Sequence, residues 1–354
     1  MTTPAPIRAL NDSLKAWLFD HALPLWWRVG ADRVKGGCFE KIDQGGKAVE
    51  GPRRARVVAR QAWVYAEAGK LGWAGPWREA RDHALDALTT TFARRDGLYR
   101  ILADAEGNPL DESANPYEQA FALLALSGAG RELEAIRARE AMKTAGLLRP
   151  DGGVLDEGLL KANPMMHLFE AVQAWAAVGT DTGWKTLADT IAARAEASMI
   201  APDTGALGEL FDTDWRLLAE ADVEPGHQFE WGWLLLAHGR GEHGAARRLI
   251  EIGETGGIEQ GVAIFSLDQR LAPRDRSARL WAQTERLHAH TAARNWDGVL
   301  KGAEGLHRYL DVPVSGLWRD RLLPDGTLVD EPAPASSLYH IVSAISALDA
   351  ACRE

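Results

Sequence analysis

Gly208-Glu-Leu-Phe-Asp212 and Gly316-Leu-Trp-Arg-Asp320 are two copies of one loose pattern that recurs along the chain: a glycine, a few apolar or mixed residues, and then an aspartate. The other copies are Gly37-Cys-Phe-Glu-Lys-Ile-Asp43, the stretch from Gly97 to Asp104, Gly153-Val-Leu-Asp156 and Gly261-Val-Ala-Ile-Phe-Ser-Leu-Asp268. Successive glycines are 60, 56, 55, 53 and 55 residues apart, so the pattern occurs six times at a nearly constant interval. Such a period indicates an architecture built from repeated units.

Each copy of the pattern is followed by an apolar segment that is rich in Ala, Leu and aromatic residues around most of its circumference, as is typical of helices buried on both sides. These segments are 57–71, 117–130, 165–179, 228–239, 278–293 and 336–350. Between them lie helices with a single apolar stripe, such as 77–94. Asn115-Pro116 and Asn163-Pro164 each read as a capping asparagine followed by proline at the first helical position.

Six buried helices that alternate with six amphipathic ones, without a linker between them, predict a single all-α domain over residues 1–354. We expect a closed ring in which an inner layer of helices lies within an outer layer, with short β-hairpin-like excursions in the loops at one end. An open helical solenoid is the alternative, but it would need atypical capping repeats and polar faces on its inner helices.

The composition excludes several classes of protein. The 354 residues include 40 Lys and Arg against 50 Asp and Glu, a net charge of −10, which disfavours binding to nucleic acids and anionic membranes. No apolar run approaches the ~20 residues of a membrane span, and the first residues lack the apolar core of a secretory signal. Cys38 and Cys352 are too few for a disulfide scaffold or a cysteine zinc site. We therefore expect a cytoplasmic enzyme or binder of neutral small molecules.

If the buried helices run parallel, the residues near their first turns gather around one cavity. In chain order these residues are Arg60, Glu118, His167, His227, Trp281 and His340, at spacings of 58, 49, 60, 54 and 59. Three histidines that keep the period of the repeat indicate a shared site, because a histidine near its unperturbed pKa is the usual general acid or base at neutral pH.

Two of these histidines have a glutamate one turn later, at Glu170 and Glu230. Residues three apart share a helical face, so each glutamate can orient its imidazole. Glu118 can instead form a capping box with Asn115. The His-x-x-Glu order differs from that of helical di-iron sites, so we expect no metal. His288 and His290 cannot share a helical face, and we expect both to lie on the solvated surface.

The expected cavity would be electrostatically positive, because helix amino termini carry partial positive charge and Arg60 adds a full charge. Positive potential stabilises developing negative charge, such as that of an enediolate. Together with histidines for proton transfer and tryptophan faces for stacking, this favours proton abstraction next to a sugar carbonyl.

Five motifs surround these residues: Arg60-Gln-Ala-Trp63, Asn163-Pro-Met-Met-His167-Leu-Phe-Glu170, Glu224-Pro-Gly-His227-Gln-Phe-Glu230-Trp231, Trp281-Ala-Gln-Thr-Glu285 and Ser337-Leu-Tyr-His340. Together they resemble the N-acylglucosamine 2-epimerase superfamily, which includes aldose–ketose isomerases and cellobiose 2-epimerase. The resemblance implies an (α/α)6 barrel without a metal or redox cofactor.

The resemblance also implies roles for the site residues. His227 and His340 are similar to the family's general acid/base pair, and His167 to a third group that opens the ring or positions the substrate. Glu230 would orient His227. The substrate-binding residues implied are Arg60, Asn163, Glu118, Trp281, Glu170 and Trp318.

The segment Pro334-Ala-Ser-Ser-Leu-Tyr-His340 is closer to the isomerase branch than to the epimerases. We therefore expect a free monosaccharide substrate, most simply D-mannose converted to D-fructose through a cis-enediolate, in a monomer or homodimer. A sugar 2-epimerase would use the same histidines. Arg53, Arg54 and Arg56 leave a mannose-6-phosphate isomerase open.

Two other classes remain as alternatives. A glycoside hydrolase would need a pair of carboxylates, for which Glu118, Glu230 and Asp320 are candidates, but it would leave the three histidines without a role. A sugar- or protein-binding module without catalytic activity would bind its ligand without turnover.

Overall fold

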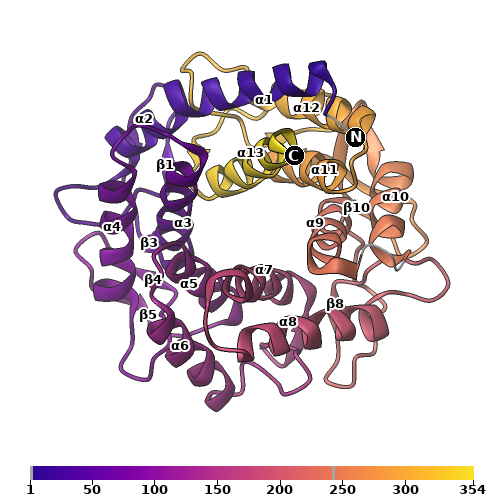
Figure 1. Ribbon diagram of the computed structural model, residues 1–354, viewed down its shortest axis with the longest axis horizontal. Coiled ribbons are helices and arrows are strands. Elements are labelled where there is room, and N and C mark those ends of the chain that lie inside the picture. Colours follow the sequence, from indigo (N-terminus) through magenta and orange to yellow (C-terminus); the bar gives the residue numbers. More distant parts are fainter. Residues whose placement is uncertain (1–2, 241–243) are drawn as a thin grey trace.

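The computed structural model describes residues 3–240 and 244–354, and within them two concentric layers of helices form a closed ring (Figure 1). The inner layer consists of α3 (Ala55–Leu71), α5 (Pro116–Gly128), α7 (Ala162–Val178), α9 (Pro225–Leu235), α11 (Leu280–Ala292) and α13 (Ser336–Arg353). Each inner helix packs against the next, and α13 contacts both α11 and α3. The expected (α/α)6 barrel is therefore confirmed, and the open solenoid is wrong.

The outer layer consists of amphipathic helices that pack on the inner ring through one apolar face. They are α1 (Ala5–Trp17), α4 (Trp77–Ala87), α6 (Glu132–Thr144), α8 (Gly183–Arg194), α10 (Ala245–Gly257) and α12 (Trp296–Leu310). The predicted helix 77–94 is α-helical only to Ala87 and ends in a π-helical turn, Leu88–Phe92. The short helix α2 (Leu23–Leu25) lies between two further π-helical turns.

The loops at the amino ends of the inner helices pair into small antiparallel sheets. Their strands are β1 (Lys41–Ile42), β2 (Ala48–Val49), β3 (Arg53–Arg54), β4 (Leu102–Ala103), β5 (Pro109–Asp111), β6 (Leu155–Asp156), β7 (Leu159–Lys161), β8 (Leu210–Phe211), β9 (Ile258–Glu259), β10 (Val262–Leu267), β11 (Pro273–Arg279), β12 (Arg321–Leu322) and β13 (Ala333–Pro334). The sheet orders are β13-β1-β2, β3-β4-β5, β6-β7-β8 and β12-β11-β10-β9. Because each sheet joins loops of different units, the sheets tie neighbouring units together.

The helix starts follow the sequence signals with one exception. Asn115 caps α5, since its Oδ1 accepts from the backbone N–H of Glu118 at 2.9 Å. Asn163 does not cap α7, because β7 leads directly into a helix that starts at Ala162, with Lys161 at the cap position. Asn163 therefore lies inside the first turn, where its side chain is free to face the cavity described below.

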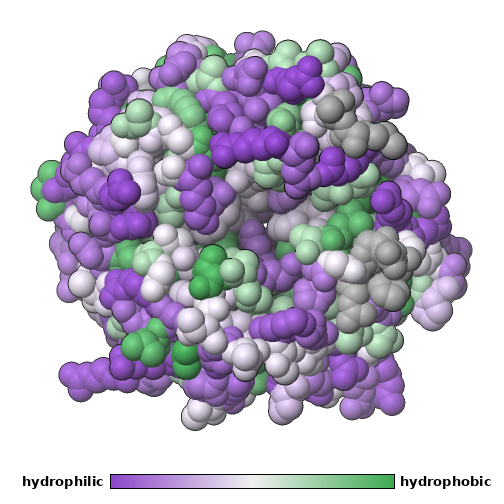
Figure 2. Space-filling view, in the orientation of Figure 1, coloured by the Kyte–Doolittle hydropathy of each residue, from purple (hydrophilic) through white to green (hydrophobic). Residues whose placement is uncertain are grey.

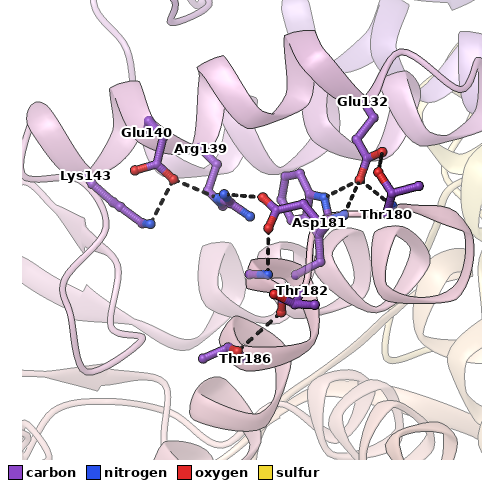
Figure 3. A network of polar contacts seen from close by, with 10 residues as sticks. Glu132, Arg139, Glu140, Lys143, Thr180, Asp181, Thr182 and Thr186 are labelled. Carbon is purple, nitrogen blue, oxygen red and sulfur yellow. Dashed lines mark hydrogen bonds and ion pairs between the residues drawn. The ribbon is translucent and has the colours of Figure 1, made fainter.

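Outer helices are also tied together by polar contacts, as Figure 3 shows for α6 and the start of α8. Glu132 accepts hydrogen bonds from the backbone N–H groups of Thr180 and Asp181, at 2.7 and 3.0 Å. Arg139 donates to the carboxylate of Asp181 at 2.7 Å. These contacts fix the turn between α7 and α8 against α6, so the outer layer holds the inner helices in place.

None of the described helices is long and apolar enough to cross a membrane. The face of the molecule in Figure 2 is mostly hydrophilic and is hollowed near the centre of the ring.

Candidate active site

The amino ends of the inner helices surround a cavity of about 320 Å³. A monosaccharide fits such a volume, since small-molecule pockets begin at roughly this size. Side chains from every inner helix line it, with additions from the loops: Arg56, Arg60, Tyr117, Asn163, His167, Glu224, His227, Glu230, Phe265, Arg279, Trp281, Ser336, Ser337 and His340. The structure thus brings together the three histidines that the sequence placed in one register.

His227, in the first turn of α9, is held by two carboxylates. Its Nδ1 lies 2.9 Å from Oε2 of Glu209 and 3.7 Å from Oε2 of Glu224. Burial opposes the positive charge, but Glu209 and Glu224 outweigh it and raise the pKa of His227 to about 10. The imidazole is therefore protonated at neutral pH, and its Nε2–H is available to a ligand as a proton donor.

The glycine before this histidine is needed for close packing. A Cβ on Gly226 would lie 2.5 Å from the ring of Trp281, so only glycine allows that ring to sit against the start of α9. The ring centroid of Trp281 lies 5.1 Å from that of His227 and 5.9 Å from that of His340. Trp281 therefore contacts both histidines and lines the cavity between them.

His340, in the first turns of α13, is held by one carboxylate from the neighbouring inner helix. Its Nδ1 lies 2.7 Å from Oε1 of Glu285, whose Oε2 accepts from the indole N–H of Trp233 at 2.7 Å. Burial disfavours the imidazolium more than Glu285 favours it, with Arg60 adding to the effect, so the pKa of His340 is lowered. This imidazole is neutral at pH 7 and can accept a proton.

His167 has a different environment from the other two histidines. Its Nδ1 lies 3.6 Å from Oε1 of Glu230 and 3.7 Å from Oε2 of Glu170, and makes no hydrogen bond within the described chain. Burial, together with the nearby positive charge of Arg60, holds the pKa of His167 well below its usual range. Its ring packs at 4.5 Å from the ring of Phe121, so it is a buried neutral imidazole.

Glu230 does not hold His227 as the resemblance implied. The partners of the His227 Nδ1 are Glu209 and Glu224, whereas Glu230 lies beside His167. Burial and the neighbouring Glu285 keep the pKa of Glu230 well above its ordinary value. The i+3 spacing places Glu230 on the inward face of α9, but the imidazole of His227 turns toward the β8 loop.

Arg60 is buried in the cavity wall beside aromatic rings. It donates to the hydroxyl of Tyr117 at 2.9 Å, and its guanidinium lies 4.1 Å from the centroid of Phe121. In the described part of the chain no carboxylate lies within ion-pair distance of it. Its charge is therefore available to an oxyanion in the cavity.

Two of the predicted substrate-binding residues lie behind the wall instead of in it. Glu118 is fully buried and forms an ion pair with Arg56, whose guanidinium does line the cavity. Glu170 contributes to a second cavity at the opposite end of the barrel. Asn163 and Trp281 line the active-site cavity as expected.

Trp318 does not line the cavity. It is fully buried and stacks on Trp26, with ring centroids 5.0 Å apart. The expectation that Trp318 binds the substrate is therefore wrong, because its ring is part of the buried core.

The expectation that His288 and His290 are solvated is wrong. His290 lies 2.7 Å from Glu254 in a buried contact, and His288 stacks on Trp233 with centroids 3.9 Å apart. They point to different sides of α11, as their spacing requires. His290 is covered by α10, which carries Glu254, whereas His288 is half-buried and lines a cavity inside the ring.

The carboxylates considered for hydrolysis are not arranged as a pair. Of Glu118, Glu230 and Asp320, only Glu230 lines the cavity. Asp320 is bound to Arg279 and Ser337, both at 2.7 Å. Hydrolysis by two of these carboxylates is therefore not supported.

Glu209 and Glu285 are functional residues that the sequence did not reveal. Glu209 follows Gly208 in the repeated loop pattern, but the pattern is defined by the glycine and the aspartate. Glu285 lies four residues after Trp281, with no signal of its own. A carboxylate that reaches a histidine from another unit has no fixed sequence spacing, so its position became visible only in the fold.

Two groups of side chains bring ligand atoms within 4.8 Å of one another: Glu209, Glu224 and His227, and Glu230, Glu285 and His340. Carboxylate and imidazole can bind divalent cations. In each group the histidine Nδ1 is already hydrogen-bonded to a carboxylate, which is also the arrangement that orients an imidazole for proton transfer. Independence from metals stays a prediction, which activity in the presence of a chelator tests.

Comparison with known proteins gives the class to which this barrel and its histidine-lined cavity belong: the chain is an isomerase of the sugar isomerase and epimerase class. It belongs to the N-acylglucosamine 2-epimerase (GlcNAc 2-epimerase) family, which residues 37–344 match.

Relatives within this class carry different activities in their names. The chain is 41% identical over 376 residues to the mannose-6-phosphate isomerase of Rhizobium meliloti (strain 1021), covering 95% of this chain and 96% of that protein. It is 26% identical over 246 residues to the cellobiose 2-epimerase of Ruminococcus albus, covering 62% of each. A crystal structure of D-mannose isomerase superposes with a TM-score of 0.83 at 19% identity, over 99% of this chain and 100% of that one. That structural likeness supports the fold.

Proposed function

We propose that this protein is an aldose–ketose isomerase that interconverts D-mannose and D-fructose. Two histidines exchange protons with the sugar, one with its carbon atoms and the other with its oxygen atoms. The observation that carries the proposal is the opposite tuning of His227 and His340, which lie on the same cavity and against the same ring of Trp281. One is a proton donor and the other a proton acceptor at neutral pH.

In the proposed mechanism, the neutral His340 removes the proton from C2 of the open-chain aldose. The C2–H electron pair becomes the C1–C2 double bond, and the carbonyl oxygen O1 takes a proton from His227. The resulting cis-enediol loses its O2 proton to His227, and C1 receives the proton held by His340. Both histidines return to their starting states, and no oxidant or reductant is needed.

Two features would stabilise the negative charge that develops on O1 and O2. Arg60 offers a buried guanidinium without a carboxylate partner in the described chain. The amino termini of the inner helices direct partial positive charge into the same cavity. We assign Arg60 to the oxygen atoms of the substrate and His167 to ring opening or to positioning.

Incubation with D-mannose in deuterated water and a chelator tests the proposal by NMR. We expect D-fructose as the product, with deuterium at C1 wherever the proton on His340 has exchanged with solvent before its transfer to C1. Glucose as the sole product, with deuterium at C2, would instead establish a 2-epimerase, which returns the proton to the other face of C2. If the protein bound sugars but converted none of them, both the isomerase and the 2-epimerase would be contradicted.

Mannose 6-phosphate is a second candidate substrate, favoured by the name of the 41% identical relative and by Arg56 and Arg279 in the cavity wall. Against it, Arg56 is paired with Glu118 and Arg279 with Asp320. Two further arginines precede Arg56 in the sequence, and both are also paired: Arg53 is buried against Asp32, and Arg54 forms an ion pair with Glu40. A higher kcat/KM for mannose 6-phosphate than for mannose would show that the phosphate, and not the free sugar, is the preferred substrate.

A further inference from the structure

A second cavity, of about 330 Å³, lies at the opposite end of the inner helices. Its walls come from the later turns of α3, α5, α7, α9, α11 and α13, whereas the active-site cavity lies at their first turns. Its lining includes Trp63, Glu170, Gln173, Trp233, His288 and Ser343. The cavity is large and polar enough to hold water, and its rim includes the exposed Lys70. We call it the far cavity.

Glu170 separates the two cavities. Its carboxyl group lines the far cavity, yet it lies 3.7 Å from Nδ1 of His167, which lines the active-site cavity. The hydroxyl of Tyr339 donates to Glu170, so the carboxyl is held in this dividing layer. Burial raises the pKa of Glu170 to about 8, which lets it exchange protons at neutral pH.

The groups on the active-site side of Glu170 include buried polar atoms without partners. Nδ1 of His167 and Oε2 of Glu230 make no hydrogen bond among the described residues. Oε1 of Glu230 lies 3.6 Å from the same Nδ1. Unsatisfied buried polar atoms are costly, so neighbouring groups of this kind point to bonds that are made in another state of the site.

Glu230 also connects these groups with His340, the proposed base. Ligand atoms of Glu230, Glu285 and His340 lie within 4.8 Å of one another. Small side-chain rotations would therefore connect His340, Glu230, His167 and Glu170 in turn. The far cavity begins at the last of these groups.

We propose that Glu170 is the inner end of a proton path that connects the active-site histidines, through His167 and Glu230, with water in the far cavity. The inference rests on the proposed function. When a sugar fills the active-site cavity, Glu170 gives its proton to water and takes one from Nδ1 of His167, which in turn takes one from Glu230. Glu230 then takes from His340 the proton that came from C2. The reverse sequence returns a proton from water to His340, so the charge of the site is unchanged. Glu170 acts through His167 and does not touch the substrate.

The experiment uses D-mannose labelled with deuterium at C2, in ordinary water, and measures the fraction of label that reaches C1 of fructose. With the unaltered protein we expect most of the label to be lost. Glu170→Gln removes the group that carries the proton, so the retained fraction should rise about threefold or more. A variant that is merely slower would give the label more time to exchange, and its retained fraction would stay the same or fall.

Two further variants keep the test sharp. Glu67→Gln removes another carboxyl that lines the far cavity, and retention should not change, because no contact links Glu67 to His167. Ala174→Leu fills the far cavity and should raise retention in the same direction as Glu170→Gln. Unchanged retention in both Glu170→Gln and Ala174→Leu would overturn the proton path alone. Absence of turnover by the unaltered protein would instead overturn the proposed function.

Discussion

The surroundings of His227 and His340 differ, although both histidines lie at the start of an inner helix and face one cavity. Around His227, the β8 loop supplies Glu209 and the cap position of α9 supplies Glu224, so that two carboxylates outweigh the cost of burial. Around His340, Glu285 is the one carboxylate of the described residues that forms an ion pair with the ring, and burial prevails.

Repeated units can therefore carry one residue type in one register and still give it opposite protonation states. The inner helix places the histidine, and the neighbouring loops and helices set its charge. A pair with separated pKa values is what reversible proton transfer between carbon and oxygen requires.

The largest effect should come from removing the two imidazoles in turn. His340→Ala and His227→Ala should each lower kcat by about 10³-fold, in the range of general acid–base catalysis. Only His340→Ala should also abolish the exchange of the C2 hydrogen with solvent, measured by NMR in deuterated water, because His340 is the proposed base. If His227→Ala abolished that exchange and His340→Ala retained it, the assigned roles would be reversed.

Glu209→Gln should have the next largest effect. Removing this carboxylate destabilises the imidazolium, so the pKa of His227 falls from about 10 and the alkaline limb of the kcat profile moves to lower pH. We expect kcat at neutral pH to fall about tenfold to 100-fold through poorer orientation. Glu251→Gln on the exposed face of α10 is the control. An alkaline limb that stays in place would mean that Glu209 does not set the charge of His227.

Glu285→Gln should move the other limb of the profile. Glu285 is the group that raises the pKa of His340 against burial, so its loss lowers that pKa further and shifts the acidic limb to lower pH. We expect a decrease in kcat of about tenfold, because Nδ1 loses its charged partner. A shift of the acidic limb to higher pH would contradict the assignment.

The smallest effects on activity should come from substituting Trp281 and Trp318, the two tryptophans that were expected to line the cavity, and these effects should differ. Trp281→Phe should raise KM about threefold to tenfold, since the ring lines the cavity and contacts both histidines. Trp318→Phe should leave KM unchanged and lower the free energy of unfolding by about 2 kcal/mol, because its ring is core packed on Trp26. Denaturant unfolding and steady-state kinetics on both variants check this pair, and a raised KM for Trp318→Phe would return that residue to the site.

The repeat made most of the fold predictable, because its period fixes both the number of units and the register of their first turns. His167, His227 and His340 could be placed together on that basis alone. The carboxylates that control them could not, since Glu209 and Glu285 reach them from other elements.

The errors share a physical cause. Trp318 and His290 are buried by neighbouring layers, and a sequence shows which face of a helix is apolar but not which partner covers it. Asn163 was expected to cap its helix because its position next to proline is the usual signal, but a strand enters the helix there one residue earlier.

Closure of the ring has a consequence for assembly. Strand β1 pairs with β13, Lys41 opposite Pro334, and Lys15 in α1 is bound to Asp349 at 2.7 Å. Contacts between segments so distant in sequence cost loop-closure entropy, and non-local contacts of this kind slow folding. The unit that closes the wall also carries His340, so a chain without its sixth unit lacks the proposed proton acceptor. Under the proposed mechanism, turnover therefore requires a closed ring.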